Sequence, residues 1–159
     1  MIVYGIDPGP FVSHVVSFDG ERVDTVWELD AEHLEEWIGT TADPRNIEDF
    51  VPYGSPVSAD SIRTIKQIGV AEYLGAVPIS RKDVKLHLCG TLQKIGDKQI
   101  REALIERFGP GEKAAKGLKK QPGPLYGVAG HYWAALAVAV VAWDRLADAE
   151  ETMERATDG

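Results

Sequence analysis

Cysteine is almost absent from the sequence, since Cys89 is the only one in 159 residues. A single thiol can build neither a disulfide framework nor a cysteine-based zinc site within the chain, so both are excluded. No apolar run reaches the roughly 18 residues that a membrane-spanning helix needs. The first residues also lack the basic stretch of a signal peptide. We therefore expect a reducing, cytoplasmic location and no membrane partner.

Basic side chains are also scarce: 17 Lys and Arg stand against 25 Asp and Glu, which leaves a net charge of −8. The deficit is uneven along the chain. Residues 1–60 carry 2 basic and 13 acidic side chains, whereas residues 61–120 carry 13 basic and 6 acidic ones. Contacts to nucleic-acid phosphates need a local basic surface rather than a basic average. The middle of the chain therefore either binds nucleic acid or forms an ordinary solvated face.

The hydrophobic segments predict an α/β fold. Three strands are expected first, at 2–6, 11–18 and 23–29, and turn residues between them favour a meander whose first strand is central. Two more strands follow at 46–51 and 76–79. Helical spacing is predicted at 31–38, 60–74, 80–88, 97–108 and 132–146. This order indicates a mixed five-stranded sheet with helices on both faces.

The length fits a single domain. We place it over residues 1–148, followed by an acidic tail at 149–159. Ser80 and Asp97 are expected to cap the helices that follow them. The segment 109–127 is rich in Gly, Lys and Pro, and it is the one stretch expected to be a mobile loop.

Asp7 is the first candidate for a chemical role. It ends a buried apolar strand within Gly-Ile-Asp-Pro-Gly, where the sheet holds its carboxylate rigidly and the Pro-Gly turn leaves space beside it. Two-metal phosphodiester chemistry needs such an anchored acid, able to bridge both ions. The alternative is that Asp7 only caps the turn, which Asp does well.

Glu48 and His131 are the other two candidates. Glu48 interrupts an apolar strand, and the two-residue period of a strand turns it to the face opposite Asp49. An acid inside a central strand is costly unless it is paired or bound to metal, whereas at a sheet edge it is an ordinary surface residue. His131 opens the last apolar helix, where it is either structural or a ligand for a metal that carboxylates also bind.

These three sites, in this order, resemble the RuvC family of Holliday-junction resolvases. The resemblance extends from about residue 2 to residue 146, nearly the whole chain. The Pro-Gly-Pro-Leu-Tyr-Gly approach to the last helix and the short length are more similar to phage members than to bacterial ones, which would place the protein in the cytoplasm of a bacterial host. The resemblance implies a ribonuclease H-like fold and a homodimer that resolves four-way or other branched DNA by paired nicks.

The resemblance also implies roles for the three candidates. Asp7 would be shared by two Mg²⁺ or Mn²⁺ ions, and Glu48 would bind one of them. His131 falls where the family has Asp or, in some members, His. In-line attack of water on a phosphodiester would follow.

One position departs from the family pattern. A further acid is usual one helical turn after the place of His131, and this chain has Ala134 there. Asp144 cannot replace it, because about 13 residues of helix span roughly 20 Å. Either three protein ligands suffice, or an acid such as Asp60 reaches the site, or cleavage is impaired.

The basic segment would supply the DNA contacts, which would be salt-sensitive and independent of base sequence. Four lysines lie in the segment that we expect to be mobile: Lys113, Lys116, Lys119 and Lys120. Two more basic residues, Arg63 and Lys66, lie one turn apart on the helix after Glu48. A further cluster is formed by Arg81, Lys82 and Lys85.

Phe50 and Tyr53 follow Glu48 closely in the chain. They either stack on an unpaired base or serve the core or the turn. The face of the following helix that carries Ile62, Ile65 and Ile68 is either a dimer interface or part of the core.

The leading hypothesis is thus a divalent-metal-dependent endonuclease that resolves Holliday junctions or other branched DNA by two-metal hydrolysis. Ala134 favours an alternative, a protein that binds branched DNA with impaired or no cleavage. A third option is a ribonuclease H-like nuclease that acts on RNA–DNA hybrids. An actin-like ATPase shares a Gly-Ile-Asp opening, but this chain is too short for its two halves and lacks further Gly-rich phosphate loops.

Overall fold

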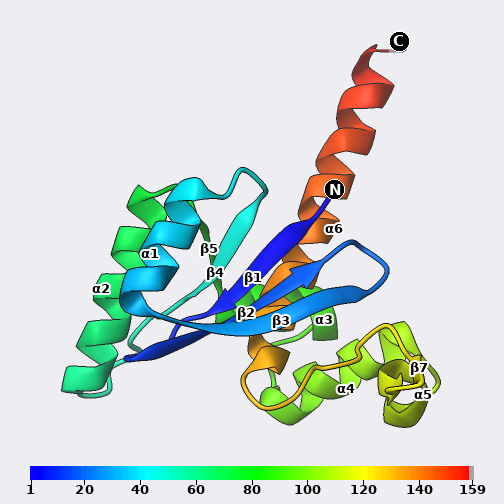
Figure 1. Ribbon diagram of the computed structural model, residues 1–159, viewed down its shortest axis with the longest axis horizontal. Coiled ribbons are helices and arrows are strands. Elements are labelled where there is room, and N and C mark those ends of the chain that lie inside the picture. The colour runs from blue at the N-terminus through cyan, green and yellow to red at the C-terminus, as the bar shows by residue number, and fades with distance from the viewer. Residues whose placement is uncertain (158–159) are drawn as a thin grey trace.

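The computed structural model describes residues 1–157 and shows a five-stranded mixed sheet between two layers of helices (Figure 1). The strands are β1 (Val3–Asp7), β2 (Val12–Phe18), β3 (Val23–Asp30), β4 (Arg45–Asp49) and β5 (Val77–Ser80). Their order in the sheet is β3-β2-β1-β4-β5. β1 is central, antiparallel to β2 and parallel to β4. The expected fold class and the central place of the first strand are confirmed.

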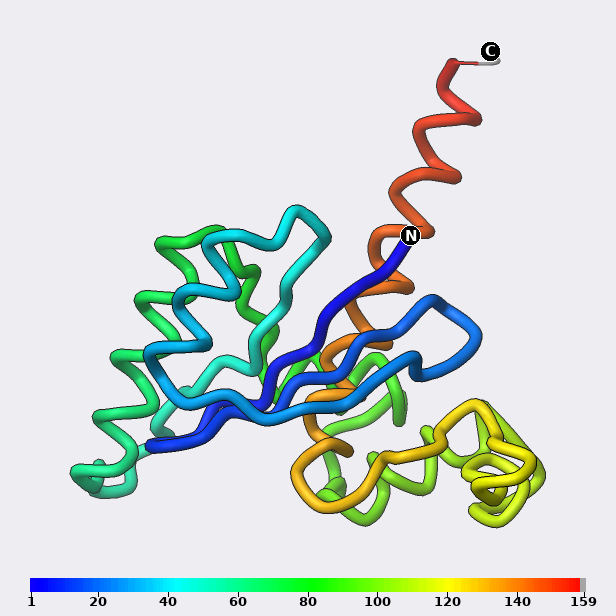
Figure 2. The backbone as a smooth tube through the Cα atoms, in the orientation of Figure 1, coloured from blue at the N-terminus to red at the C-terminus, as the bar shows by residue number. Residues whose placement is uncertain are grey.

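Helices cover both faces of this sheet. They are α1 (Ala31–Thr40), α2 (Ala59–Tyr73), α3 (Arg81–Cys89), α4 (Asp97–Phe108), α5 (Glu112–Lys116) and α6 (Tyr132–Thr157). α1 and α2 pack on one face, and α6 packs across β1, β2 and β4 on the other, with α3 and α4 beside it (Figures 1 and 2). Within residues 1–157, no helix combines the length and the apolar character needed to cross a bilayer.

Strand alternation divides the core into two clusters and sets the direction of the candidate acids. Val3 of β1 packs with α6, whereas Ile6 of β1 and Ile47 of β4 pack with α1 and α2. Asp7 and Glu48 are each one residue beyond these inward positions. Both carboxylates therefore belong to the α6 face of the sheet.

α6 crosses β1 at Gly5, where the two backbones approach so closely that a side chain would not fit. A methyl group on Gly5 would lie 2.0 Å from the carbonyl oxygen of Ala135 and 2.8 Å from the Cβ of Ala139. The helix can come this close because small residues recur along its buried face. This packing fixes the start of α6, and with it His131, beside the carboxyl end of β1.

Capping residues determine where the shorter helices begin. The hydroxyl of Ser80 accepts a hydrogen bond from the backbone N–H of Asp83 and caps α3, as expected. The expected cap of α4 is wrong: Gly96 holds the N-cap position and Asp97 is the first helical residue. The carboxylate of Asp97 pairs with Arg81 instead.

Residues 109–127 do not form the mobile loop that their composition predicts. They fold into α5 and a small hairpin of β6 (Gly117–Leu118) and β7 (Gln121–Pro122). Ala115 and Leu125 are fully buried, and the N–H of Leu125 donates to the carbonyl of Ala115. Two well-placed apolar side chains thus anchor a segment that is otherwise rich in Gly, Lys and Pro.

The last helix is longer than the apolar pattern predicts. α6 continues to Thr157, and its residues from Ala147 onward are exposed and project away from the sheet (Figure 1). The acidic tail expected at 149–159 is therefore helical up to Thr157. Residues 158 and 159 lie outside the described part of the chain.

Candidate active site

Asp7 lies at the carboxyl end of the central strand, with 16% of its side chain exposed. The parallel register pairs Ile6 with Ile47, so the next residues, Asp7 and Glu48, lie side by side near the carboxyl ends of two adjacent strands. The turn after Asp7 closes tightly, because a methyl group on Gly9 would lie 2.2 Å from the carbonyl oxygen of Val12. The sheet and this turn hold the Asp7 carboxylate in one place.

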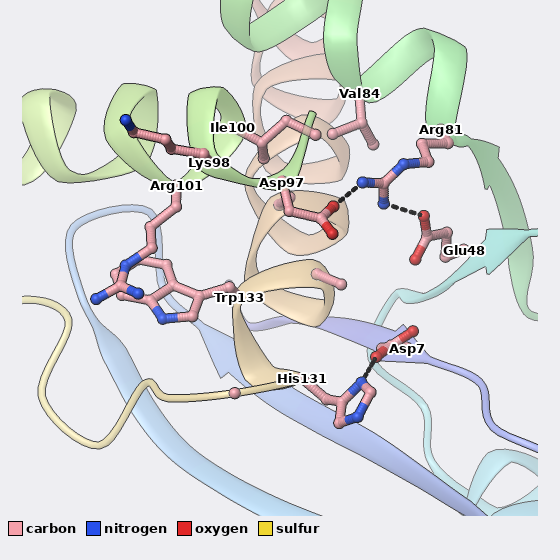
Figure 3. A pocket seen from close by; sticks show the side chains of 13 residues that line it. Asp7, Glu48, Arg81, Val84, Asp97, Lys98, Ile100, Arg101, His131 and Trp133 are labelled. Carbon is pink, nitrogen blue, oxygen red and sulfur yellow. Dashed lines mark hydrogen bonds and ion pairs between the residues drawn. The ribbon is translucent and has the colours of Figure 1, made fainter. Parts of the chain in front are cut away.

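Two histidines flank Asp7. The Nδ1 atom of His131, which directly precedes α6, lies 3.2 Å from the Asp7 carboxylate (Figure 3). His14 lies directly opposite Asp7 in the β1–β2 pairing and stacks on His131 with ring centroids 4.7 Å apart. One ligand atom from each of Asp7, His14 and His131 lies within 4.8 Å of the others.

The surroundings shift the protonation of two of these groups. Burial raises the pKa of Asp7 to about 6, and the negative charge of Glu48 adds to the rise, while His131 and Arg81 act against it. Burial also lowers the pKa of His14, and His131 lowers it further, against the opposing effect of Glu28. A buried acid that resists ionisation is stabilised by a nearby cation, and a neutral imidazole is the form that binds metal.

The three predicted residues line one cavity of about 440 Å³ beside α6 (Figure 3). Asp7, Glu48 and His131 enter it from β1, β4 and the start of α6. Trp133, Ala134 and Ala137 of α6 form an apolar side, and the beginnings of α3 and α4 close the remainder. The sequence-predicted site residues are therefore brought together, with Asp7 and His131 in direct contact.

Glu48 has a partner of its own in this cavity. Its Oε1 atom accepts a hydrogen bond from Nη1 of Arg81 at 3.2 Å, and Nη2 of Arg81 pairs with Asp97. One guanidinium thus joins an acid on β4 to an acid at the start of α4.

A second cavity of about 280 Å³ opens on the other side of Asp7 and Glu48. Phe50, Tyr53 and Thr64 line it. Tyr53 is 76% exposed and Phe50 41% exposed, so neither is a core residue. Their rings are available to an approaching ligand beside the two acids.

The donor set around Asp7 fits a divalent cation. A carboxylate with two imidazoles offers one oxygen and two nitrogen ligands, a set that divalent transition metals accept more readily than Mg²⁺, which prefers oxygen ligands. Asp7, His131 and His14 would hold the ion, with Glu48 nearby.

The predicted substrate-binding residues lie at different distances from this site. Arg63 of α2 lies over the ring of Phe11, 4.8 Å from its centroid, in the β1–β2 turn that follows Asp7. Lys66 is exposed on the same helix. The four lysines of the 109–127 segment lie on or beside α5 and the β6–β7 hairpin, and none of them lines either cavity that contains Asp7.

Sequence reasoning missed three residues of this site: His14, Arg81 in its pairing role, and Asp97. A signal for His14 existed, because a tight turn after Asp7 places a residue of the returning strand directly opposite it. Arg81 and Asp97 meet only because α3 and α4 begin side by side, and no local pattern reports such proximity.

Comparison with known proteins tests the fold of this chain but not the roles of its individual residues. Neither a protein-family model nor a curated sequence matches the chain. A structure of RuvC from Thermus thermophilus is similar over 89% of this chain and 92% of that chain, with a TM-score of 0.59 and 17% identity. This chain has the RuvC fold. A structure of Thermus thermophilus RuvC in complex with a Holliday junction substrate covers 89% of this chain and 91% of its own, with a TM-score of 0.55 and 15% identity. The RuvC-like, ribonuclease H-like architecture is thus confirmed over nearly the whole length of both chains.

Proposed function

We propose that this protein is a divalent-metal-dependent endonuclease that cuts branched DNA, with four-way junctions as its leading substrate. The observation that carries the proposal is the meeting of Asp7, Glu48 and His131 in one cavity. These side chains come from three distant segments, and each lies where an element of the RuvC fold begins or ends. The existence of a RuvC structure with a Holliday junction substrate supports the choice of substrate.

The metal would be Mg²⁺ or Mn²⁺, held at Asp7 and His131. When bound, it supplies positive charge that activates a water molecule and stabilises the pentacoordinate phosphoryl group. Asp7 anchors the site because the sheet fixes it, and His131 is fixed by the packing of α6 against Gly5. Asp7 must also ionise to act as a ligand, which its burial opposes until a cation is near.

The surfaces around the cavity fit a DNA strand. Lys98 and Arg101 of α4 line the main cavity, where they can contact phosphates next to the bond that is cut. α5 packs on α4, so the lysines of α5 and the β6–β7 hairpin extend this basic surface away from the site. Tyr53 and Phe50 would stack on an unpaired base in the second cavity. Arg63 and Lys66 would contact the backbone on the α2 side.

A homodimer forms part of the proposal, because paired nicks need two sites. On α2, Ile68 packs into the core, but Ile62 and Ile65 are 45% and 37% exposed. Tyr73, at the end of the same helix, is 89% exposed. Exposed apolar side chains grouped on one helix are typical of an interaction surface. Light scattering in solution is expected to give twice the mass of the chain.

The second candidate function is binding of branched DNA without cleavage. It is favoured by Ala134, which lines the cavity and offers no ligand where a further acid is usual in this type of site. The two functions share their DNA contacts and differ only in chemistry.

A labelled four-way junction incubated with Mn²⁺ or Mg²⁺ separates these functions. The nuclease is expected to give paired nicks, to lose them in Asp7→Asn and Glu48→Gln, and to keep its junction affinity in both variants. Tight junction binding with no product from the wild type would leave the binding function. An RNA–DNA hybrid in the same assay tests the third option, and preferential cutting of the hybrid would replace the junction as substrate.

A further inference from the structure

Arg81 lines the main cavity, with 39% of its side chain exposed. It is the first residue of α3, and its guanidinium lies between Glu48 and Asp97, paired with both (Figure 3). The side chain of Glu48 is only 16% exposed, so this pair is largely screened from solvent on one side. A guanidinium stays protonated throughout the working range of an enzyme. Glu48 therefore faces a permanent positive charge.

The fixed charges of the cavity do not favour a second divalent ion. Three acids and three bases line it: Asp7, Glu48, Asp97, Arg81, Lys98 and Arg101. Two dications would add four positive charges to a lining that is already balanced. Ala134 contributes no ligand, and the group of potential ligands around Asp7 contains His14 and His131 but not Glu48.

We propose that Arg81 is a catalytic residue that takes the place of the second cation, so that a single divalent ion held by Asp7, His14 and His131 is sufficient. This inference rests on the proposed nuclease function and states that Arg81 completes the catalytic site. Glu48 then acts as the acid that positions the Arg81 guanidinium, together with Asp97, instead of binding an ion itself. Each acid contacts a different terminal nitrogen, Nη1 to Glu48 and Nη2 to Asp97, so the guanidinium is held from two directions.

The chemistry assigned to Arg81 is charge stabilisation during hydrolysis. The oxygen of a water molecule forms a bond to phosphorus, and its proton passes to solvent. The bond from phosphorus to one bridging oxygen breaks, its electron pair stays on that oxygen, and the oxygen takes up a proton. Negative charge grows on the phosphoryl oxygens and on the leaving oxygen, and a guanidinium beside them stabilises both.

The competing role for Arg81 is structural, as a clip that joins β4 to the start of α4. A clip would affect folding stability, and its removal would also free Glu48 and Asp97 to bind an ion. The ion count, measured without DNA or turnover, therefore tests whether Arg81 keeps a second ion out, and the cleavage rate of folded Arg81→Met tests whether its charge acts in catalysis.

The test is a titration of the full-length protein with MnCl₂ alone, in which electron paramagnetic resonance of free Mn²⁺ gives the number of bound ions. The wild type is expected to bind one Mn²⁺ per chain. Arg81→Met frees Glu48 and Asp97 and is expected to bind a second, weaker ion. Arg81→Lys keeps the charge and is expected to remain at one ion. Arg22→Met, which removes a positive charge from the β2–β3 turn at the opposite end of the sheet, is the matched control and also remains at one.

Two Mn²⁺ ions on the wild type, or a single ion on both the wild type and Arg81→Met, would overturn the proposal. A thermal melt of each variant checks that it is folded. If Arg81→Met does not fold, a second Mn²⁺ ion on the wild type would still overturn the proposal.

In the junction assay, at a Mn²⁺ concentration just sufficient for the first ion, Arg81→Met is expected to cut about 100-fold more slowly. Its junction affinity should stay within about threefold of the wild type, because the loss lies in the transition state. An unchanged rate would also contradict the role of Arg81. If the wild type cuts no substrate, the nuclease function fails, while the ion count still reports on Arg81.

Discussion

Asp7 is held in a place where its charged form is disfavoured until a cation arrives. Burial raises its pKa to about 6, and the Glu48 carboxylate contributes to the rise. In the metal-free protein, the folded state therefore takes up a proton on Asp7 at a higher pH than the unfolded state does. This is the arrangement expected of a residue kept for binding rather than for stability.

Replacing Asp7 by Asn is expected to stabilise the metal-free protein at pH 8 by on the order of 1–3 kcal/mol. Because the pKa of Asp7 is higher in the folded state, wild-type stability falls as the pH rises through the window from 3.8 to about 6. The gain of Asp7→Asn should therefore vanish toward pH 4. Urea unfolding in EDTA at both pH values measures it. Asp148→Asn, on the exposed part of α6, is the control without this pH-dependent gain, and an equal gain of Asp7→Asn at pH 4 and pH 8 would refute the argument.

The sequence singled out Asp7, Glu48 and His131 because each stands where an apolar strand or helix is interrupted or begins. Their meeting in one cavity agrees with that interpretation. The sequence did not point to His14, because its position opposite Asp7 depends on the register of the β1–β2 pairing. The Arg81–Asp97 pair depends on two helices that start side by side, a tertiary relation that leaves no periodicity in the chain.

At the scale of elements, the position of α6 on β1 determines the geometry of the site. The helix carries His131 at its start and passes over Gly5, where its backbone leaves no room for a side chain. The small residues of α6 and Gly5 of β1 together allow the helix to lie close against the strand. The sequence shows these small residues, but it does not show that they contact each other.

Substitution of Gly5 by Ala is expected to destabilise the protein by about 3 kcal/mol, because the carbonyl of Ala135 and the backbone of Ala139 cannot move independently of α6. Chemical denaturation measures this loss. Gly69→Ala in α2 is the matched control: a Cβ there meets nothing within 4 Å, and the helix propensity of Ala should add about 1 kcal/mol. If both substitutions changed stability alike, close packing at Gly5 would not be what positions α6.

The strands and the longer helices could be predicted because their apolar residues recur with clear periods. The segment 109–127 could not, since composition alone suggested a loop and the structure depends on two buried side chains, Ala115 and Leu125. The full length of α6 was not predicted either, because the apolar pattern ends near residue 146. Its last part is exposed and has no apolar stripe, so helix formation there follows from continuation of the buried part.

At the scale of the whole molecule, charge is distributed unevenly along the chain. The acidic residues concentrate in the first 60 positions and the basic ones in the next 60. Lys98 and Arg101 bring this basic surface to the rim of the main cavity, and α5 with the β6–β7 hairpin carries it outward. In the proposed function, a DNA arm lying along this surface would reach the site at the main cavity, where Asp7 and Glu48 lie.

Replacing Lys119 and Lys120 together by Ala is expected to weaken junction binding and to reduce the slope of log affinity against log salt by about 2, since each phosphate that a lysine neutralises adds roughly 0.9 to that slope. Fluorescence anisotropy across a salt series measures both quantities. The control removes two charges elsewhere, Arg22→Met with Arg155→Met, and should leave the slope unchanged. An unaltered slope in the double lysine variant would place the DNA on another surface.

The most direct measurement is the anomalous diffraction of Mn²⁺ in crystals of the protein soaked in MnCl₂. One strong peak per chain is expected, within bonding distance of the Asp7 carboxylate and the His131 imidazole, with Arg81 still between Glu48 and Asp97. Crystals with no peak at Asp7, while Mn²⁺ is bound elsewhere or not at all, would contradict this expectation.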